Sequence, residues 1–251
     1  MMTIKECWSL QINGDEMNNV KIGVIGAAGV AATNKLCELI EEKMTLQGAY
    51  RDCHHPEMIV WQATQVPSRS MYLEGKGESF IPGYIEIAKK LEECGATKIC
   101  MCCNTAHYAI EEIRKSISVP MIDMIEATVY KVRECSKKRV GIMASDGCVK
   151  YKIYDKYINA ICPDVTVVYP DSYHQKLVTK GICNIKNSNR FLEIDAEERP
   201  NHIFSQVKEY LLYQERVDIV VSGCTDIRVD FINKDGIDSL EVLRDEIINC
   251  Y

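Results

Sequence analysis

The chain has 251 residues, 47% of them hydrophobic and 26% charged, and its formal net charge is −6. This length suits one large domain or two small ones. The negative charge argues against a nucleic-acid-binding face and against adhesion to an acidic membrane. No apolar run reaches the roughly 18 residues of a membrane span, and the N-terminal segment lacks a signal peptide's apolar core. We therefore expect a cytoplasmic protein.

Cysteine is unusually frequent, with 13 copies. Most of these cysteines lie inside apolar runs, as Cys37, Cys94 and Cys100 do, where cysteine usually behaves as a small buried hydrophobe. Because the chain is long and shows no export signal, we expect no structural disulfide.

Apolar runs alternate with helical patterns along the chain. In the first half we expect strands within residues 20–29, 57–63 and 97–102, with helices at 31–43, 81–95 and 105–117. In the second half we expect strands at 119–123, 139–145, 165–170 and 217–223, with helices at 126–138, 175–184 and 199–215. The strands are almost continuously apolar, which is typical of parallel sheets covered by helices on both faces. The fold class is therefore α/β.

Two strands end in similar motifs. "GATKICMCCNT" leads through Cys103 to Thr105, and "RVDIVVSGCT" leads to Cys224 and Thr225. Each motif places a cysteine at the carboxyl end of a parallel strand, where α/β proteins bind their ligands. Two related halves that face each other would bring these cysteines together.

The residues after Cys103 have two compatible interpretations. Asn104 and Thr105 are of the types that cap helices. The same helix start would offer free N–H groups to a substrate carboxylate and would favour the thiolate form of Cys103.

A cysteine from each half suggests a particular reaction. If the two sulfurs flank one Cα, one can remove its proton while the other returns a proton from the opposite side. Such a two-base racemisation requires no metal or cofactor, but it does require fixed geometry and stabilisation of a carbanion-like transition state.

The chain resembles the aspartate/glutamate racemase family, the cofactor-independent amino-acid racemases. It contains "CNTAH" at residues 103–107 and "GCTD" at 223–226, where the family usually has GCTE. "IGVIGAAGVAAT" is similar to the family's IGIIGGMGPLAT, and "TQVPSRSMYLEGKGES" is similar to its PQIPDRT and GKGE segments. The similarity extends from about residue 21 to the C-terminus.

The resemblance implies Cys103 and Cys224 as the acid/base pair, with no cofactor and no metal. It also implies a set of substrate-binding residues: Asn104, Thr105 and Thr225 at the α-carboxylate, and Arg69 and Lys186 at substrate carboxylates. Two cations would suit a dicarboxylic substrate, aspartate first and glutamate second.

The resemblance further implies two similar domains with parallel-rich sheets flanked by helices, a site in the cleft between them, and a homodimer. We expect an N-terminal extension at 1–20, a first domain at 21–120 plus about 228–251, and a second domain at 121–227. Two departures from the family pattern bear on substrate identity: Ala28 replaces a methionine, and Ser68 replaces the aspartate before Arg69.

Other functions stay open from the sequence. Cys100, Cys102, Cys103 and His107, or Cys53 with His54 and His55, would be ligands of a zinc or iron–sulfur site. Against this, successive strand side chains point to opposite faces, and no CxxC pair has zinc-ribbon spacing. His107 is better explained by packing than by ligation. "GVIGAAG" lacks the spacing of a nicotinamide-binding turn. A racemase or isomerase of another small acid or of hydantoins, a decarboxylase, and a non-catalytic protein that binds acidic amino acids are further alternatives.

Overall fold

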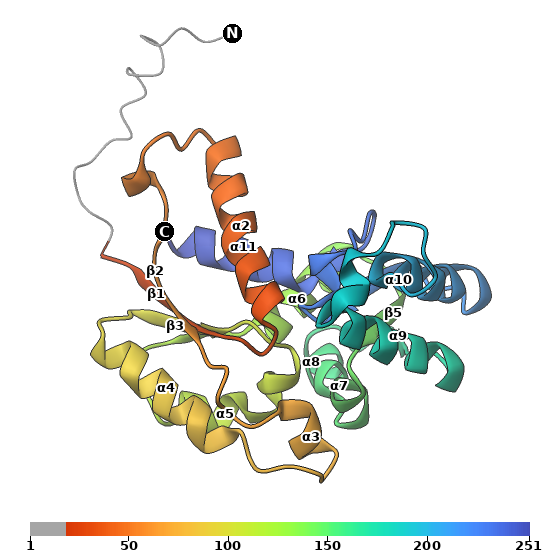
Figure 1. Cartoon of the computed structure of the whole chain (residues 1–251), viewed down its shortest axis with the longest axis horizontal. Coiled ribbons are helices and arrows are strands. Elements are labelled where there is room, and N and C mark those ends of the chain that lie inside the picture. Colours follow the sequence, from red (N-terminus) through yellow and green to blue (C-terminus); the bar gives the residue numbers. More distant parts are fainter. Residues whose placement is uncertain (1–18) are drawn as a thin grey trace, which may run out of the picture.

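The computed structural model describes residues 19–251, which form two four-stranded sheets covered by helices (Figure 1). The strand order is β2-β1-β3-β4 in one sheet and β6-β5-β7-β8 in the other, and all neighbouring strands are parallel. The expected α/β fold is confirmed. The expected N-terminal extension lies outside the described residues, apart from Asn19 and Val20.

Each sheet comes from one half of the chain. The first contains β1 (Lys21–Gly26), β2 (Glu57–Gln62), β3 (Lys98–Met101) and β4 (Met121–Ile122). The second contains β5 (Arg139–Ala144), β6 (Thr166–Val168), β7 (Ile219–Gly223) and β8 (Ile237–Asp238). All residues of β1 and β5 after the first are buried, as expected for central strands covered on both faces. The sequence did not predict β8, which is too short to form an apolar run.

Helices cover both sheets. The longer ones are α2 (Val30–Leu46), α4 (Ile81–Glu93), α6 (Met124–Glu134), α8 (Ile153–Ile161), α9 (Ser172–Ile185), α10 (Pro200–Glu209) and α11 (Ser239–Cys250). The short ones are α3 (Arg69–Leu73), α5 (Ile110–Arg114) and α7 (Asp146–Lys150). Within residues 19–251, no helix is both long enough and apolar enough to cross a membrane.

The remaining elements are short turns with 3₁₀ or π-helical geometry rather than α-helical geometry. The 3₁₀ turns are η1 (Asp52–His54), η2 (Thr105–Ala109), η3 (Ser188–Phe191) and η5 (Ile227–Val229), and η4 (Tyr210–Gln214) is a π-helical turn. Two expected helices therefore differ from the structure. The helix expected at 105–117 begins as η2 before α5, and the helix expected at 199–215 ends in η4 after α10.

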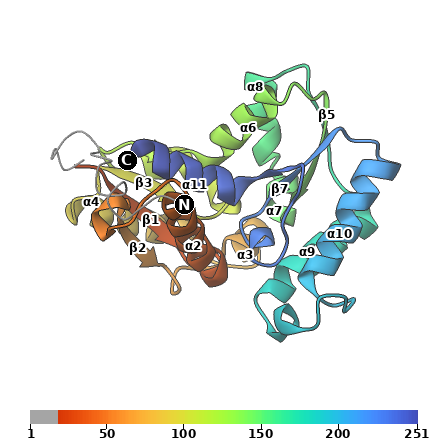
Figure 2. The ribbon, with the colours of Figure 1, turned by 90° about the horizontal axis from the view of Figure 1, so that it is seen from above.

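The last strand of each sheet leads into a helix that packs on the other sheet. After β4, helix α6 joins the second core, where Ile125 and Val129 contact the cluster that contains Val140. After β8, helix α11 returns to the first core, where Leu240 joins the cluster around Ile22. Figure 2 shows α11 running beside α2 towards the first sheet, with α6 on the side of the second. We keep the division into domains as a proposal, in which the halves exchange helices.

The two crossing points have similar sequences, "IDMIE" at 122–126 and "IDSLE" at 237–241. In the first, Asp123 Oδ1 accepts hydrogen bonds from the N–H groups of Ile125 (3.1 Å) and Glu126 (3.0 Å). In the second, Asp238 Oδ1 accepts from the N–H groups of Leu240 (2.8 Å) and Glu241 (3.3 Å). An aspartate thus caps each crossing helix in the same way.

The second oxygens of these aspartates have different surroundings. Asp123 Oδ2 accepts hydrogen bonds from Tyr157 (2.7 Å) and Arg114 (3.3 Å). Burial acts to raise the pKa of Asp123, but His107 and these hydrogen bonds lower it below its ordinary value. Asp238 Oδ2 has no hydrogen-bond partner among the described residues. Burial, followed by the charge of Glu241, raises the pKa of Asp238 to about 7.

Candidate active site

The two motif cysteines follow central strands of the two sheets. Cys103 lies two residues beyond β3, and Cys224 directly follows β7. Each is only 8% exposed. The chain continues into a 3₁₀ turn in both cases, η2 after Cys103 and η5 after Cys224, rather than into the expected α-helix. These turns are too short to build much of a helix dipole, so side-chain charges dominate the electrostatics of the site.

Lys186 connects the two cysteines electrostatically. It caps the C-terminus of α9, and its side chain is 49% exposed. Burial acts to lower the pKa of Lys186, but Asp226, Cys224 and Cys103 together raise it above its ordinary value. Both sulfurs therefore lie close enough to this ammonium group to raise its pKa, and a site shared by the two halves stays a prediction.

Cys224 is held as a thiol in this environment. Burial raises its pKa well above the ordinary value, Asp226 and Cys103 raise it further, and Lys186 opposes them. The protonated form therefore dominates at neutral pH.

Arg69 reaches the site from the start of α3. Its Nη2 donates a 2.7 Å hydrogen bond to the carbonyl of Ala28 in the turn after β1, and its Nε is buried without a hydrogen-bond partner among the described residues. Burial acts to lower the pKa of Arg69, but Cys103, Tyr84 and Asp226 raise it overall. Ala28, where the family pattern has methionine, therefore contributes a backbone contact to the site.

Asp226 lies at the centre of these charges, although it was noted from the sequence only as part of a motif. It is 4% exposed, and its Oδ2 is 3.1 Å from Lys186 Nζ. Its Oδ1 has no hydrogen-bond partner among the described residues. Burial raises the pKa of Asp226, while Lys186 and Arg69 act to lower it. Asp226 also contacts Gly29, because a Cβ added to Gly29 would lie 2.0 Å from Asp226 Oδ1.

Asn104 joins the halves instead of capping a helix. It is 2% exposed, its Nδ2 donates to Ser239 Oγ at 3.0 Å, and its Oδ1 accepts from the Tyr154 hydroxyl at 2.5 Å. Both partners belong to elements of the second half, α8 and α11. The side-chain amide is therefore already engaged, and contact with a substrate carboxylate through the backbone N–H stays a prediction.

The two threonines also bridge the halves. Thr105 Oγ1 lies 2.7 Å from the hydroxyl of Ser145, the N-cap of α7. Thr225 Oγ1 donates to the carbonyl of Cys102 at 3.3 Å. Neither Asn104 nor Thr105 makes a side-chain capping bond to η2. Their roles at an α-carboxylate stay predictions.

Two residues that were not assigned to the site from the sequence surround Cys103. Tyr84 is fully buried, its hydroxyl has no hydrogen-bond partner among residues 19–251, and burial followed by Cys103 raises its pKa. His107 Nδ1 lies 2.8 Å from the Cys103 carbonyl, and its Nε2 accepts from the Met124 N–H at 3.3 Å. Because burial lowers the pKa of His107, the imidazole is neutral, with Nδ1–H as the donor. His107 thus holds the backbone of the cysteine loop.

The neighbouring cysteines point to opposite faces of the sheet. Cys100 and Cys102 pack with Leu36, whereas Cys103 packs with Ile25 on the other side. Among the described residues, no group of three or more His, Cys, Asp or Glu side chains is placed to hold a metal ion. The twelve cysteines in this part of the chain are all free.

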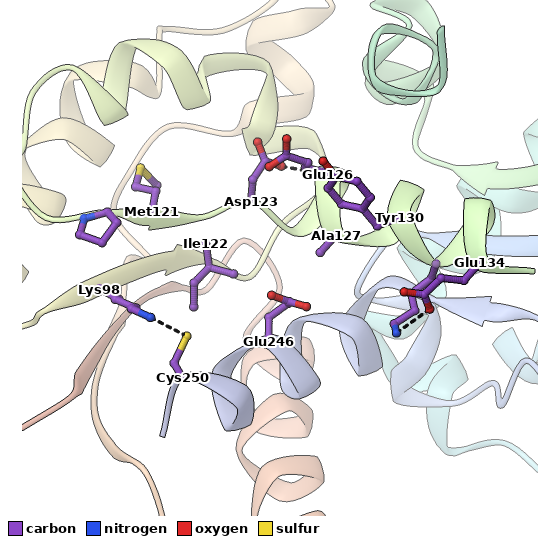
Figure 3. Close-up of a pocket in the computed structure, with 12 residues that line it drawn as sticks. Lys98, Met121, Ile122, Asp123, Glu126, Ala127, Tyr130, Glu134, Glu246 and Cys250 are labelled. Carbon is purple, nitrogen blue, oxygen red and sulfur yellow. Dashed lines mark hydrogen bonds and ion pairs between the residues drawn. The ribbon is translucent and has the colours of Figure 1, made fainter. Parts of the chain in front are cut away.

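Two surface pockets are lined by other residues. The pocket in Figure 3, of about 340 Å³, lies between β4, α6 and α11, and the Lys98 ammonium donates to Cys250 Sγ at 3.2 Å in its wall. None of the predicted site residues lines it. A second pocket, of about 360 Å³, lies between α2 and η3 and includes Arg190, whose charge acts on Asp226.

Similar proteins share this architecture. The aspartate racemase of Picrophilus torridus has a TM-score of 0.75 at 24% identity, with 92% of this chain and 93% of that chain covered. The aspartate racemase homologue from Pyrococcus horikoshii OT3 has a TM-score of 0.68 at 21% identity, with 91% and 97% covered. At these identities the likeness shows the fold.

Sequence comparison identifies the family to which the chain belongs. The broad specificity amino-acid racemase RacX of Bacillus subtilis (strain 168) is 28% identical over 241 residues, which cover 92% of this chain and 97% of that protein. The profile of the family described as Asp/Glu/Hydantoin racemase matches residues 22–238, a stretch that includes both cysteine motifs. The resemblance seen in those motifs is thereby confirmed: this chain belongs to the Asp/Glu/hydantoin racemase family of amino-acid racemases.

Proposed function

We propose that this chain is a cofactor-independent amino-acid racemase in which Cys103 and Cys224 exchange protons with one Cα from opposite faces. The main support is that the two cysteines follow central strands of the two sheets, are each 8% exposed, and are adjacent to residues in contact, since Thr225 Oγ1 donates to the Cys102 carbonyl at 3.3 Å. The free amino acid would lie between them, with its α-carboxylate near the cations and the backbone N–H groups of the two turns.

The residues around the two cysteines determine which cysteine is protonated at the start of each direction of the reaction. With Cys224 protonated, Cys103 as thiolate removes the α-proton, and Cys224 delivers its own proton to the other face. In the reverse direction Cys224 must be the thiolate, and the adjacent Lys186 stabilises that charge. The carbanion-like transition state is stabilised by fixed positive charge in a site shielded from water.

Two substrate classes follow from two observations. Arg69 and Lys186 favour a dicarboxylic amino acid, aspartate first and glutamate second, as expected from the sequence. The ion pair between Lys186 and Asp226 favours a wider range of amino acids, since it already occupies one of the two cations. The Bacillus subtilis relative, described as a broad specificity amino-acid racemase, agrees with the second class.

The test is exchange of the α-proton. The purified protein is incubated in D₂O with individual L-amino acids and their D-enantiomers, and ¹H NMR and chiral chromatography follow deuterium entry and inversion. Cys103→Ser and Cys224→Ser should each abolish inversion. One variant should retain exchange of the L form and the other exchange of the D form. Cys94→Ser is the matched control, because Cys94, which was expected to be buried, is exposed.

Two results would reject the proposal. Inversion by Cys224→Ser at nearly the parental rate would show that a single base suffices. Binding of amino acids without any α-proton exchange by the parent would assign the chain to the non-catalytic alternative.

Assembly and location complete the proposal. We keep a homodimer and a cytoplasmic location as predictions. Light scattering of the purified protein tests the homodimer, because a single species of about twice the 28.5 kDa chain mass is expected.

A further inference from the structure

Two buried donors beside Cys103 have no acceptor among the described residues. The hydroxyl of Tyr84 and the Nε of Arg69 are both buried without a hydrogen-bond partner in residues 19–251. Cys103 lies close enough to both side chains to raise their pKa values. A buried donor without an acceptor costs stability, so two such donors at one place point to an anion that forms or binds there.

The position of the Tyr84 hydroxyl is set by the core of the first half. Tyr84 lies on α4 and is 0% exposed. Its ring packs edge-on against Phe80, with 5.3 Å between the ring centroids, and it belongs to the same buried cluster as Cys103. Phenylalanine would serve this packing equally well, because it has the same ring and no hydroxyl to desolvate. The hydroxyl therefore needs an explanation other than packing.

The thiolate of Cys103 is the acceptor that fits this hydroxyl. A thiol sulfur accepts hydrogen bonds only weakly, whereas an anion accepts them strongly. Cys103 is 8% exposed, and a buried anion is costly unless donors or cations face it. Burial and Cys103 raise the pKa of Tyr84, so the phenol keeps its proton and can donate it in a hydrogen bond to a thiolate. A substrate enters from solvent, so its carboxylate is a less suitable acceptor for a wholly buried hydroxyl.

The charge of Cys103 also acts on titratable groups of other elements: Arg69 on α3, Cys102 beside it, Cys148 on α7, Lys186 after α9 and Cys224 after β7. The three other thiols are neutral at pH 7, because burial raises their pKa values. Of the two cations, Lys186 is paired with Asp226. His107, which binds the Cys103 carbonyl, is neutral. Lys186 acts to lower the pKa of Cys224, so each motif cysteine has a different group to stabilise its thiolate.

We propose that the Tyr84 hydroxyl donates a hydrogen bond to the Cys103 thiolate and thereby stabilises the form of Cys103 that removes the α-proton. This inference rests on the racemase function proposed above. It adds a residue of α4 to the same site.

The first experiment compares the parent with Tyr84→Phe, which removes only the hydroxyl. Peptide mass spectrometry follows the alkylation of Cys103 by iodoacetamide from about pH 6 to about pH 10, with the exposed Cys94 as an internal reference. In the rising part of this pH profile, Cys103 should react about tenfold more slowly in Tyr84→Phe, as expected for the loss of a hydrogen bond to an anion. The pH at which its rate is half-maximal should rise by about one unit.

The second experiment measures α-proton exchange with both enantiomers in two single-cysteine backgrounds. In Cys224→Ser the exchange depends on Cys103, and adding Tyr84→Phe should lower its kcat/KM by about tenfold. In Cys103→Ser the exchange depends on Cys224, and Tyr84→Phe should change it by less than about twofold. Tyr210→Phe is the matched control, because the buried Tyr210 donates to Glu215 at 2.6 Å, and it should leave the alkylation of Cys103 unchanged.

Thermal unfolding separates this role from a structural one. Tyr84→Phe removes an unpartnered hydroxyl and should keep or raise the melting temperature, whereas Tyr210→Phe removes a partnered one and should lower it. A folded Tyr84→Phe with parental alkylation of Cys103, or an equal loss of exchange in both backgrounds, would overturn the role of Tyr84 while racemisation stands. A parent that exchanges no amino acid would reject the proposed function, and the alkylation profile would still decide whether Tyr84 acts on Cys103.

Discussion

The contact between Gly29 and Asp226 predicts an unusual response to a small substitution. In Gly29→Ala, the added Cβ would lie 2.0 Å from Oδ1, 2.9 Å from Cγ and 3.1 Å from Oδ2 of Asp226. Non-bonded carbon and oxygen atoms need a separation of more than about 3 Å, so the carboxylate or the turn must move by about 1 Å. Overpacking of this kind costs about 1–3 kcal/mol.

A further loss comes from the ion pair. The Lys186–Asp226 pair is 3.1 Å long, but the lysine is half-exposed, so displacing Asp226 forfeits no more than about 1 kcal/mol. Gly29→Ala should therefore lower the free energy of unfolding by about 1–4 kcal/mol in total. Urea unfolding followed by circular dichroism, under reducing conditions, measures this change.

The same substitution should be harmless once Asp226 is shortened. In an Asp226→Ala background the three atoms nearest to the new Cβ are gone, and the extended backbone at residue 29 accepts alanine. Alanine also restricts the unfolded chain, which stabilises the fold by about 0.4–1 kcal/mol. A double-mutant cycle should thus give a coupling energy of about 1–5 kcal/mol. Equal destabilisation in both backgrounds would refute the argument.

Three more predictions concern other parts of the molecule. Asp238, with its pKa raised to about 7, binds a proton more tightly when folded than when unfolded, so the stability that it provides is present at low pH and is lost as pH rises to 7. Asp238→Asn keeps the cap of α11, and from pH 5 to pH 8 it should gain roughly 1–3 kcal/mol in unfolding free energy relative to the parent; parallel pH profiles would contradict this. Ala27 has a φ of 57°, where glycine is less strained, so Ala27→Gly should keep or raise the melting temperature, and a clear fall would contradict this. Racemisation should survive EDTA and hydroxylamine; its loss, or a need for added pyridoxal phosphate, would contradict a cofactor-independent mechanism.

Much of the fold could be predicted because the central strands carry a strong signal. The apolar runs that became β1, β3, β5 and β7 are almost wholly buried, which is typical of parallel sheets covered on both faces. Most elements that escaped prediction were short, such as β8, or were set by distant contacts, but the longer helix α8 (Ile153–Ile161) was also missed. The 3₁₀ turn after Cys103 belongs to the second group, because Asn104 is drawn to Tyr154 and Ser239 of the other half. Both partners are far from Asn104 in the sequence, so the sequence around Asn104 could not indicate these contacts.

The site was only partly predictable for the same reason. Cys103 and Cys224 could be singled out because each follows a strand within a recognisable motif. The engagement of Lys186 by Asp226 could not be foreseen, since it depends on how α9 meets the turn after β7. Nothing in the sequence placed Tyr84 in the site, because a tyrosine on the buried face of α4 is explained by core packing alone.

The crossing of α11 has a consequence for biosynthesis. The first sheet is made early, but part of its cover, Leu240, Leu243 and Ile247, belongs to α11, which follows all eight of the described strands in the sequence. Chains usually fold from the N-terminus as they leave the ribosome. Here the N-terminal half must wait, with Ile22 and Val24 incompletely covered, until α11 has been synthesised and is free to dock. The half that is synthesised first is therefore completed last.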